Sequence, residues 1–287
     1  MIQSMMEYFI QREGTHLPEL PEVETTCRGI EPHLVGVRVL KVVIRQPKLR
    51  WPVPMALKVE LSGEVISSIK RRGKYLIFHS RLGSLISHLG MSGSFRILSN
   101  SAAPKKHDHV DFILENGKTL RYNDPRRFGC ILWEKGDAYQ HPLLSGLGPE
   151  PLSAEFNKDV LFKKSRNRKT SVKTFIMDSK TVVGVGNIYA NEALFSAGIH
   201  PKRLANRVSK KRYVTLTHSI KQILLRAVSM GGTTLRDFTN EDGKPGYFSQ
   251  SLQVYGRARK PCIHCATTLK EIRINQRSTV YCSKCQN

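Results

Sequence analysis

The sequence has few acidic residues, no long apolar run and few cysteines. Its 287 residues include 23 Asp and Glu against 46 Lys and Arg, a formal net charge of +23. No apolar run approaches the roughly 20 residues of a membrane-spanning helix, which disfavours a protein with such helices. A basic excess of this size suits a polyanion, and nucleic acid is the first candidate. A membrane surface or an acidic protein could use the same charge.

Cysteine is almost confined to the end of the chain. Four of the six cysteines lie within residues 262–287, and Cys27 and Cys130 stand alone. This is not a secreted disulfide framework, and we take the two isolated cysteines as small buried residues. Residues 1–17 lack a basic region followed by a long apolar core, so we expect no signal peptide and a cytoplasmic setting.

The middle of the chain changes from strand-like to helix-like patterns. From Val35 to Trp133, short alternating runs separated by Gly and Ser predict an all-β sandwich or barrel. The first run, 37–42, is too apolar on both sides for an exposed edge strand. Asn116-Gly117 between two runs predicts a hairpin. The other runs are Tyr75–His79, Leu85–His88 and Ser94–Leu98.

Beyond a predicted linker at Gly146–Pro151, helical spacing takes over. It predicts helices near 156–161, 189–197 and 220–227, the last two ended by Gly198 and Gly231-Gly232. The polar segment Thr233–Gln250 is too long for a simple connection and predicts a functional or mobile loop.

The stretch Pro18–Glu24 reads Pro-Glu-Leu-Pro-Glu-Val-Glu. Two prolines suit a helix's first turn better than its interior, and acids there suit the macrodipole. From Glu24 to Leu34 helical spacing follows, with apolar residues at Val23, Cys27, Ile30 and Leu34. Taken alone, the stretch is a helix entry.

The last 26 residues carry a metal-site pattern. Cys262 and Cys265 are separated by two residues, as are Cys282 and Cys285, with sixteen residues between the pairs. This spacing predicts a tetrahedral zinc site. Four thiolates leave no open position, so one structural zinc is expected, and it should supply the folding free energy of this small tail.

Five motifs occur in order along the chain. They are Pro18–Glu24, His88-Leu-Gly-Met-Ser-Gly, Asp124-Pro-Arg-Arg-Phe-Gly, Val183-Gly-Val-Gly-Asn-Ile-Tyr-Ala and the four-cysteine tail. Together they resemble the bacterial formamidopyrimidine-DNA glycosylase family, whose members remove oxidised purines such as 8-oxoguanine from duplex DNA in base excision repair. The resemblance runs from about Leu17 to the C-terminus.

The resemblance implies an α+β, multidomain fold. It places a catalytic β-sandwich at 18–148, a helix–two-turn–helix domain at 149–250 with a lesion-closing loop at 233–250, and a zinc finger at 251–287. Residues 1–17 would be an extension. A monomer bound to DNA in the bacterial nucleoid is expected.

The resemblance also implies roles for four catalytic residues. After the damaged base is flipped out, the secondary amine of Pro18 attacks C1′ and forms a Schiff base. Glu19 is the general acid/base. Lys74 assists β-elimination, and Arg277 at the finger tip assists δ-elimination. Lys74 would otherwise be an ordinary solvated strand lysine.

Further residues are implied to hold DNA. Met91, Arg126 and Phe128 would fill the space left by the flipped base, although Met91 and Phe128 would ordinarily be core residues. The others, matched to DNA contacts, are His88, His107, Lys169, Lys173, Asn187 and Tyr255. Of these, His88 would ordinarily be a satisfied core histidine.

The sequence departs from the family at the nucleophile. Family members begin Met-Pro, whereas here Leu17 precedes Pro18 and sixteen residues precede Leu17. The Pro18 nitrogen as written is a tertiary amide, which cannot form a Schiff base. We hypothesise that translation starts at Leu17, read as a methionine that is then removed. A retained extension would instead give a catalytically inactive DNA-binding protein.

Two other functions compete with this interpretation. A sister class with the same architecture acts on oxidised pyrimidines, but the Leu20–Glu24 continuation and the long 233–250 loop favour purines. A non-catalytic, zinc-stabilised DNA-binding module is the alternative from another class. A zinc-dependent hydrolase is disfavoured because cysteine saturates the one clear metal site.

Overall fold

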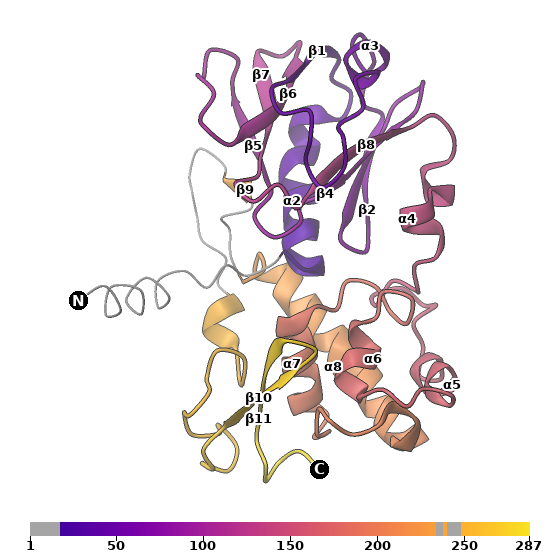
Figure 1. Cartoon of the computed structure of the whole chain (residues 1–287), viewed down its shortest axis with the longest axis vertical. Helices are drawn as coiled ribbons and strands as arrows, with labels where there is room; N and C mark the ends of the chain where they lie inside the picture. The colour runs from indigo at the N-terminus through magenta and orange to yellow at the C-terminus, as the bar shows by residue number, and fades with distance from the viewer. Residues whose placement is uncertain (1–17, 234–237, 240–247) are drawn as a thin grey trace, which may run out of the picture.

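The computed structural model describes residues 18–233, 238–239 and 248–287, which form an upper and a lower half in Figure 1. The upper half contains α2 (Leu20–Leu34), α3 (Leu57–Glu60) and the strands β1 to β9. The strands are β1 (Val39–Ile44), β2 (Ser68–Arg72), β3 (Tyr75–His79), β4 (Ser84–His88), β5 (Ser94–Ser99), β6 (Asp108–Leu114), β7 (Lys118–Asn123), β8 (Cys130–Glu134) and β9 (Phe238–Thr239). Two short helices, η1 (Ala138–Gln140) and α4 (Pro142–Ser145), lead out of this half.

The strands form two sheets, which confirms the predicted β-sandwich. One sheet has the order β1-β6-β7-β5-β9 and the other β2-β3-β4-β8. The predicted hairpin is present: Phe112 pairs with Leu120 across β6 and β7, and Gly117 in the turn has φ +78°. Only glycine adopts that conformation at little cost. β9 pairs with β5 in parallel, and most of the predicted 233–250 loop lies outside the described residues.

One expectation about the first strand was wrong. β1 is at the edge of its sheet, and its Leu40 is 53% exposed. α3 packs against this strand, so a short helix shields part of an edge that the apolar pattern placed inside the sheet.

Helix α2 connects the two halves of the molecule. Its apolar face, which includes Val23, Cys27, Ile30 and Leu34, is buried in the core between the sheets. The helix begins at Leu20 with Pro21 in its first turn, which confirms the predicted helix entry within Pro18–Glu24. Its first turn reaches the lower half, where α2 contacts α8 (Figure 1). Residues just ahead of Leu20 are thereby placed at the junction.

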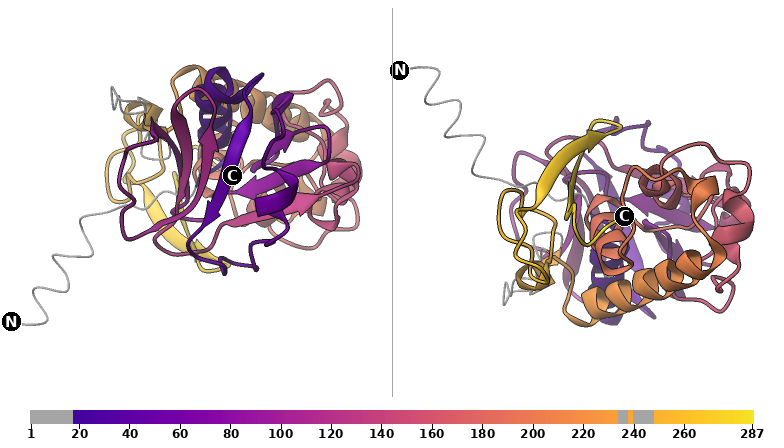
Figure 2. Two further views of the ribbon diagram at one scale, coloured as in Figure 1. Left: turned by 90° about the horizontal axis from the view of Figure 1, so that it is seen from above. Right: turned by 90° about the horizontal axis from the view of Figure 1, so that it is seen from below.

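The lower half is helical, with a small hairpin beside it (Figure 2). Its elements are α5 (Val160–Ser165), α6 (Val172–Met177), α7 (Asn187–Ser196), η2 (Ala205–Arg207), α8 (Lys210–Ser229), η4 (Phe248–Ser251), β10 (Lys270–Ile274) and β11 (Arg277–Tyr281). The helices predicted near 189–197 and 220–227 are confirmed as α7 and α8. The one predicted near 156–161 begins later, at Val160, so Phe156 precedes it, and α6 was not predicted. Ile188–Phe195 of α7 are all buried, so this helix is the centre of the half. Within the described residues, no helix is long and apolar enough to cross a membrane.

Candidate active site

The Glu19 carboxylate lies at the N-terminus of α7. It accepts hydrogen bonds from the backbone N–H groups of Gly186 (2.9 Å) and Ile188 (3.0 Å), and it is 2% exposed. The first amides of a helix have no intrahelical partner, and the helix dipole favours an anion there. A Cβ added to Gly186 would lie 2.1 Å from the Glu19 Cδ atom. The second glycine of the Val183–Ala190 motif therefore makes room for this acid.

The environment of Glu19 adjusts its proton affinity. The pKa of Glu19 is raised to about 7, mainly by burial and with a further rise from the charge of Glu22, while the charge of Lys74 and the hydrogen bonds from Ile188 and Tyr189 oppose the rise. At neutral pH the carboxyl group is therefore close to half protonated. A group in that state can both give and accept a proton.

Pro18 is buried directly before this acid, and the backbone around it is fixed. The Leu20 N–H donates to the Gly184 carbonyl (3.2 Å), and the Glu19 N–H donates to the Glu22 carboxylate (2.9 Å). Gly184 has φ +79°, and a Cβ there would lie 2.5 Å from the Leu20 Cδ1 atom. Both glycines of the motif therefore fit against the Pro18–Leu20 segment.

Glu22 is a buried acid to which sequence reasoning gave no role. Besides the Glu19 N–H, its carboxylate accepts from the Tyr189 hydroxyl (2.8 Å) and from the N–H (2.8 Å) and hydroxyl (3.0 Å) of Thr233. It thus joins α2, α7 and Thr233, which follows α8 in the chain. Its place in a Pro-Glu-rich helix start carried no sign of these partners.

A cavity of about 550 Å³ opens between the two halves, and three of the predicted residues line it: Lys74, His88 and Arg277. Lys74 lies in the two-residue turn between β2 and β3, not on a strand as expected, because Gly73 turns the chain with φ +58°. Arg277 opens β11, directly after a turn whose Asn275 and Gln276 both have positive φ. The cavity therefore brings together cations that are far apart in sequence.

His88 is a neutral group among these cations. Burial, together with the charges of Lys74 and Arg50, lowers its pKa to about 4. The Gly90 N–H donates to its Nδ1 atom (2.9 Å), so the neutral ring carries its proton on Nε2. His88 is thus a hydrogen-bond donor at neutral pH. Arg50, which also lines the cavity, was missed by sequence reasoning.

The predicted trio Met91, Arg126 and Phe128 lies on two loops that are tied together. The Ser92 hydroxyl donates to the Asp124 carboxylate (2.6 Å) and accepts from the Arg126 N–H (3.1 Å). The Arg126 guanidinium lies 5.0 Å from the centre of the Phe128 ring. Phe128 is 47% exposed, so it is not the core residue that its type would suggest.

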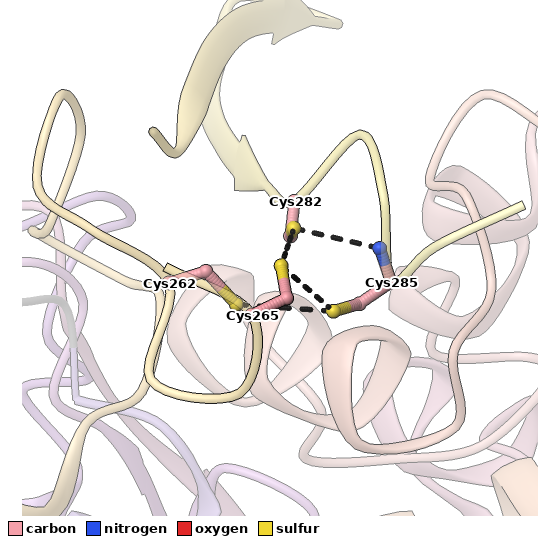
Figure 3. Close-up of side chains that lie close together, drawn as sticks. All are labelled: Cys262, Cys265, Cys282 and Cys285. Carbon is pink, nitrogen blue, oxygen red and sulfur yellow. Dashed lines mark hydrogen bonds between the residues drawn. The ribbon is translucent and has the colours of Figure 1, made fainter. Parts of the chain in front are cut away.

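The four cysteines of the tail converge, as Figure 3 shows. Their Sγ atoms all lie within 4.8 Å of one another, with 3.5 Å between those of Cys265 and Cys282. Zn–S bonds of about 2.3 Å in a tetrahedron give Sγ–Sγ separations of about 3.8 Å, so the residues fit the ion. The cysteines hold one structural zinc, which confirms the prediction.

The finger docks on α7 through polar side chains. The Asn191 Oδ1 atom accepts from the Val280 N–H (2.9 Å), and the Asn187 side chain donates to the Ser278 carbonyl (3.1 Å). The Glu192 carboxylate accepts from three consecutive backbone N–H groups, those of residues 253–255, at 2.8–2.9 Å. Asn191 and Glu192 were missed; adjacent polar residues inside a buried apolar helix were the available signal.

Lys173 was predicted as a DNA contact, but the structure places it inside the protein. It is 1% exposed, and its Nζ atom donates to the Ser278 carbonyl (2.9 Å) and the Thr279 hydroxyl (2.6 Å). Its pKa is lowered to about 7, mainly by burial and also by the charge of Arg277, while the charge of Glu19 opposes the shift. In this conformation Lys173 connects α6 to β11 and has no surface to offer to a phosphate.

The remaining predicted contacts lie around the same junction and on the nearby surface. His107 is half-buried ahead of β6, and its carbonyl accepts from the Asp124 N–H (3.1 Å). Lys169 is exposed between α5 and α6. Burial raises the pKa of Tyr255, the charge of Glu19 adds to the rise, and a hydrogen bond with Asn187 opposes it.

Comparisons with known proteins match the whole described architecture. The formamidopyrimidine-DNA glycosylase N-terminal domain matches residues 17–131, the H2TH domain of the same enzymes matches 147–239, and the zinc finger found in FPG and IleRS matches 259–287. Formamidopyrimidine-DNA glycosylases of Marinobacter nauticus and Syntrophotalea carbinolica are 59% and 55% identical to this chain over 270 residues, covering 94% of this chain and 100% of each relative.

Solved structures agree with these relatives. MutM (Fpg) from Thermus thermophilus superposes with a TM-score of 0.84 at 37% identity, over 94% of this chain and 98% of that one. Lactococcus lactis Fpg in complex with abasic-site DNA gives 0.87 at 34% identity, over 94% and 100%. The same protein with DNA containing Fapy-dG gives 0.86 at 34%, with the same coverage.

Proposed function

This chain belongs to the formamidopyrimidine-DNA glycosylase family and is a DNA glycosylase of base excision repair, and we propose that it excises oxidised purines and then cleaves the strand. The observation that carries the proposal is the buried Glu19, with a pKa of about 7, held by α7 next to Pro18. The Lactococcus lactis relative has been solved with abasic-site DNA and with Fapy-dG DNA, which supports damaged duplex DNA as the substrate class.

Base removal in this proposal uses Pro18 and Glu19. The Pro18 nitrogen forms a bond to C1′ as the glycosidic bond breaks, and the departing base takes up the proton that the nitrogen loses. The C1′–O4′ bond then opens, O4′ takes a proton from Glu19, and an iminium between C1′ and the Pro18 nitrogen remains. The step requires a free imino group, so the active form begins at Pro18, and a duplex base must first be flipped out.

Strand cleavage uses the cations of the cavity. The iminium acidifies the C2′ proton; Lys74 assists its removal as the 3′ phosphate leaves in β-elimination. Arg277 assists the second, δ-elimination that releases the other phosphate. His88, neutral with a proton on Nε2, suits a phosphate oxygen as a hydrogen-bond donor.

The remaining residues bind the duplex. Met91, Arg126 and Phe128 fill the space of the flipped base. Asn187 contacts a phosphate, and His107, Lys169 and Tyr255 make further DNA contacts. Neutralisation of phosphates makes affinity fall steeply with salt. We place the domain limits at 18–148, 149–250 and 251–287, and the site of action at the chromosomal DNA of the cytoplasm.

Borohydride trapping tests the proposal. The native protein is mixed with duplexes that contain 8-oxoguanine or thymine glycol, reduced, and the cross-linked residue is mapped by peptide mass. We expect an adduct on the Pro18 nitrogen, formed faster with 8-oxoguanine. Preference for thymine glycol would favour pyrimidine lesions. An adduct at another residue, or full activity in protein whose intact mass includes Met1, would overturn the mechanism, and binding without any adduct would leave only a DNA-binding protein.

A further inference from the structure

The Arg71 guanidinium bonds to three separate segments of the chain. Arg71 is in β2, and its side chain is 11% exposed. Its Nε atom donates to the Glu24 carboxylate on α2 (2.7 Å). One of its terminal nitrogens donates to the Glu150 carboxylate in the linker (2.7 Å) and to the Gly73 carbonyl (3.0 Å). A planar, multidentate cation of this kind fixes geometry as well as charge.

In the turn that carries Lys74, both backbone polar groups of Gly73 are hydrogen-bonded. The Gly73 carbonyl accepts from Arg71, and the Gly73 N–H donates to Glu150 (2.6 Å). Arg72 adds a bond to the same carboxylate (2.9 Å). Gly73 needs its positive φ, and Lys74 follows it directly. The direction in which Lys74 leaves the turn is therefore set by the Arg71–Glu150 pair.

The other end of this bridge leads to the residues that start the reaction. Glu24 is on α2, the rigid helix that begins at Leu20, directly after Pro18 and Glu19. Burial raises the pKa of Glu24, but hydrogen bonds and charge from Arg71, and then from Arg28, outweigh it and hold the pKa below its usual value. Glu24 is consequently charged at neutral pH and remains a partner for Arg71.

From this geometry we propose that Arg71 is a positioning residue, which sets the distance between Lys74 and the Pro18–Glu19 pair by tying the β2–β3 turn to α2 and to the linker. The proposal rests on the role given to Lys74 above. A misplacement of about 1 Å can cost roughly 100-fold in rate. Arg71 itself touches neither substrate nor reacting atoms.

The test is a double-mutant cycle on strand cleavage. The single-turnover rate of β-elimination is measured on a duplex with a preformed abasic site, at saturating enzyme, for wild type, Arg71→Met, Lys74→Ala and the double variant. We expect Arg71→Met to slow elimination about tenfold or more, and to slow it less than twofold further once Lys74 is already alanine. Residues that act as one unit are non-additive in this way.

Arg28→Met is the matched control. Arg28 pairs with the same Glu24 carboxylate (2.8 Å), but its side chain is 64% exposed and it lies on α2 rather than beside the turn. The same substitution at Arg28 removes one positive charge next to Glu24 and should change the elimination rate less than twofold. A purely electrostatic effect on α2 would instead appear in both variants.

Several results would overturn the proposal. Arg71→Met with wild-type rates would do so, as would a full tenfold loss in the Lys74→Ala background, because the effect would then bypass Lys74. If Lys74→Ala alone leaves elimination unchanged, the assigned role of Lys74 fails and the positioning role fails with it. If circular dichroism shows Arg71→Met to be unfolded, Glu150→Gln, which weakens the same bridge, replaces it in the cycle with the same expectations.

Discussion

The two walls of the cavity are stabilised by different physical means. The Lys74 wall belongs to a sandwich whose core fills the space between two sheets and α2, and its turn is held by Glu150, which forms ion pairs with Arg71 and Arg72 and accepts from the Gly73 N–H. The Arg277 wall is a two-stranded hairpin, and its small core consists of six buried residues, two of which, Cys262 and Cys282, are zinc ligands.

This difference means that the walls can be disturbed separately. A hairpin of two strands is not stable by itself in water. The finger gains its stability from zinc and from the side chains of α7 that bind its backbone, whereas the sandwich has a core of its own. Because Glu19 is bound at the N-terminus of the same helix, α7 joins the acid to the finger.

The largest expected effect comes from removing the metal. Cys282→Ser, or treatment with a strong chelator, should unfold the finger, because zinc supplies about 10–16 kcal/mol in such small domains. We expect cleavage of lesion DNA to fall more than 100-fold, with the sandwich still folded by circular dichroism and limited proteolysis.

The matched control for the metal is Cys27→Ala. Cys27 is a buried cysteine of α2 outside the zinc finger, and burial raises its thiol pKa to about 12. Its replacement should leave zinc content, measured by a colorimetric assay, and cleavage nearly unchanged. Zinc-free protein that cleaves at the wild-type rate would show that the Arg277 wall does not depend on the metal.

The second largest effect is expected from replacing the acid, Glu19. Glu19→Gln should reduce base release by about 10²–10⁴-fold, the usual contribution of a general acid. Cleavage of preformed abasic sites should fall much less, since no base has to leave. In the wild type, base release should decline as pH rises through about 7, where Glu19 loses its proton.

Glu31→Gln on the exposed side of α2 is the control and should remain within twofold of wild type. A Glu19→Gln variant with the same pH profile as wild type would assign the titration to another group. Equal losses of base release and of abasic-site cleavage would point to general damage of the site.

How much of this was predictable from sequence depended on how local each arrangement is. The zinc ligands lie in two short loops with a fixed spacing, so the residues alone predicted the site. The hairpin at Asn116-Gly117 was predictable for the same reason. Lys173 was misplaced because nothing near it in sequence shows that Ser278 and Thr279 would enclose its amine.

The acid illustrates the same limit. Glu19 accepts hydrogen bonds from the N–H groups of Gly186 and Ile188, and its pKa is raised to about 7. Both properties depend on a contact between the two halves of the molecule, which the sequence near Glu19 does not show. Glu150 was predicted only as part of a domain linker, yet it is bound by Arg71, Arg72 and Gly73. The family resemblance indicated which residues to examine, but not these partners.

A moderate effect is expected where the acid meets α7. Gly186→Ala would place a methyl group 2.1 Å from the Glu19 Cδ atom. We expect the acid to be displaced, at a cost of about 1–3 kcal/mol in the free energy of unfolding and with loss of base release. Gly146→Ala is the control, since a Cβ there meets nothing within 4 Å. Denaturant titration and single-turnover base release measure the two effects, and equal behaviour of the two variants would contradict the close fit.

The smallest expected effect is the contribution of the buried Lys173 to the pH dependence of stability. Because burial lowers the pKa of Lys173 to about 7 in the folded protein, the unfolded chain binds more protons at this residue between about pH 7 and the ordinary lysine pKa near 10.4. Stability therefore rises with pH across that window. Lys173→Met keeps the length of the side chain but has no proton to lose. The difference in melting temperature, wild type minus Lys173→Met, should increase from pH 7 to pH 9. A difference that stays constant or decreases would mean that Lys173 remains charged between α6 and β11 in the folded protein.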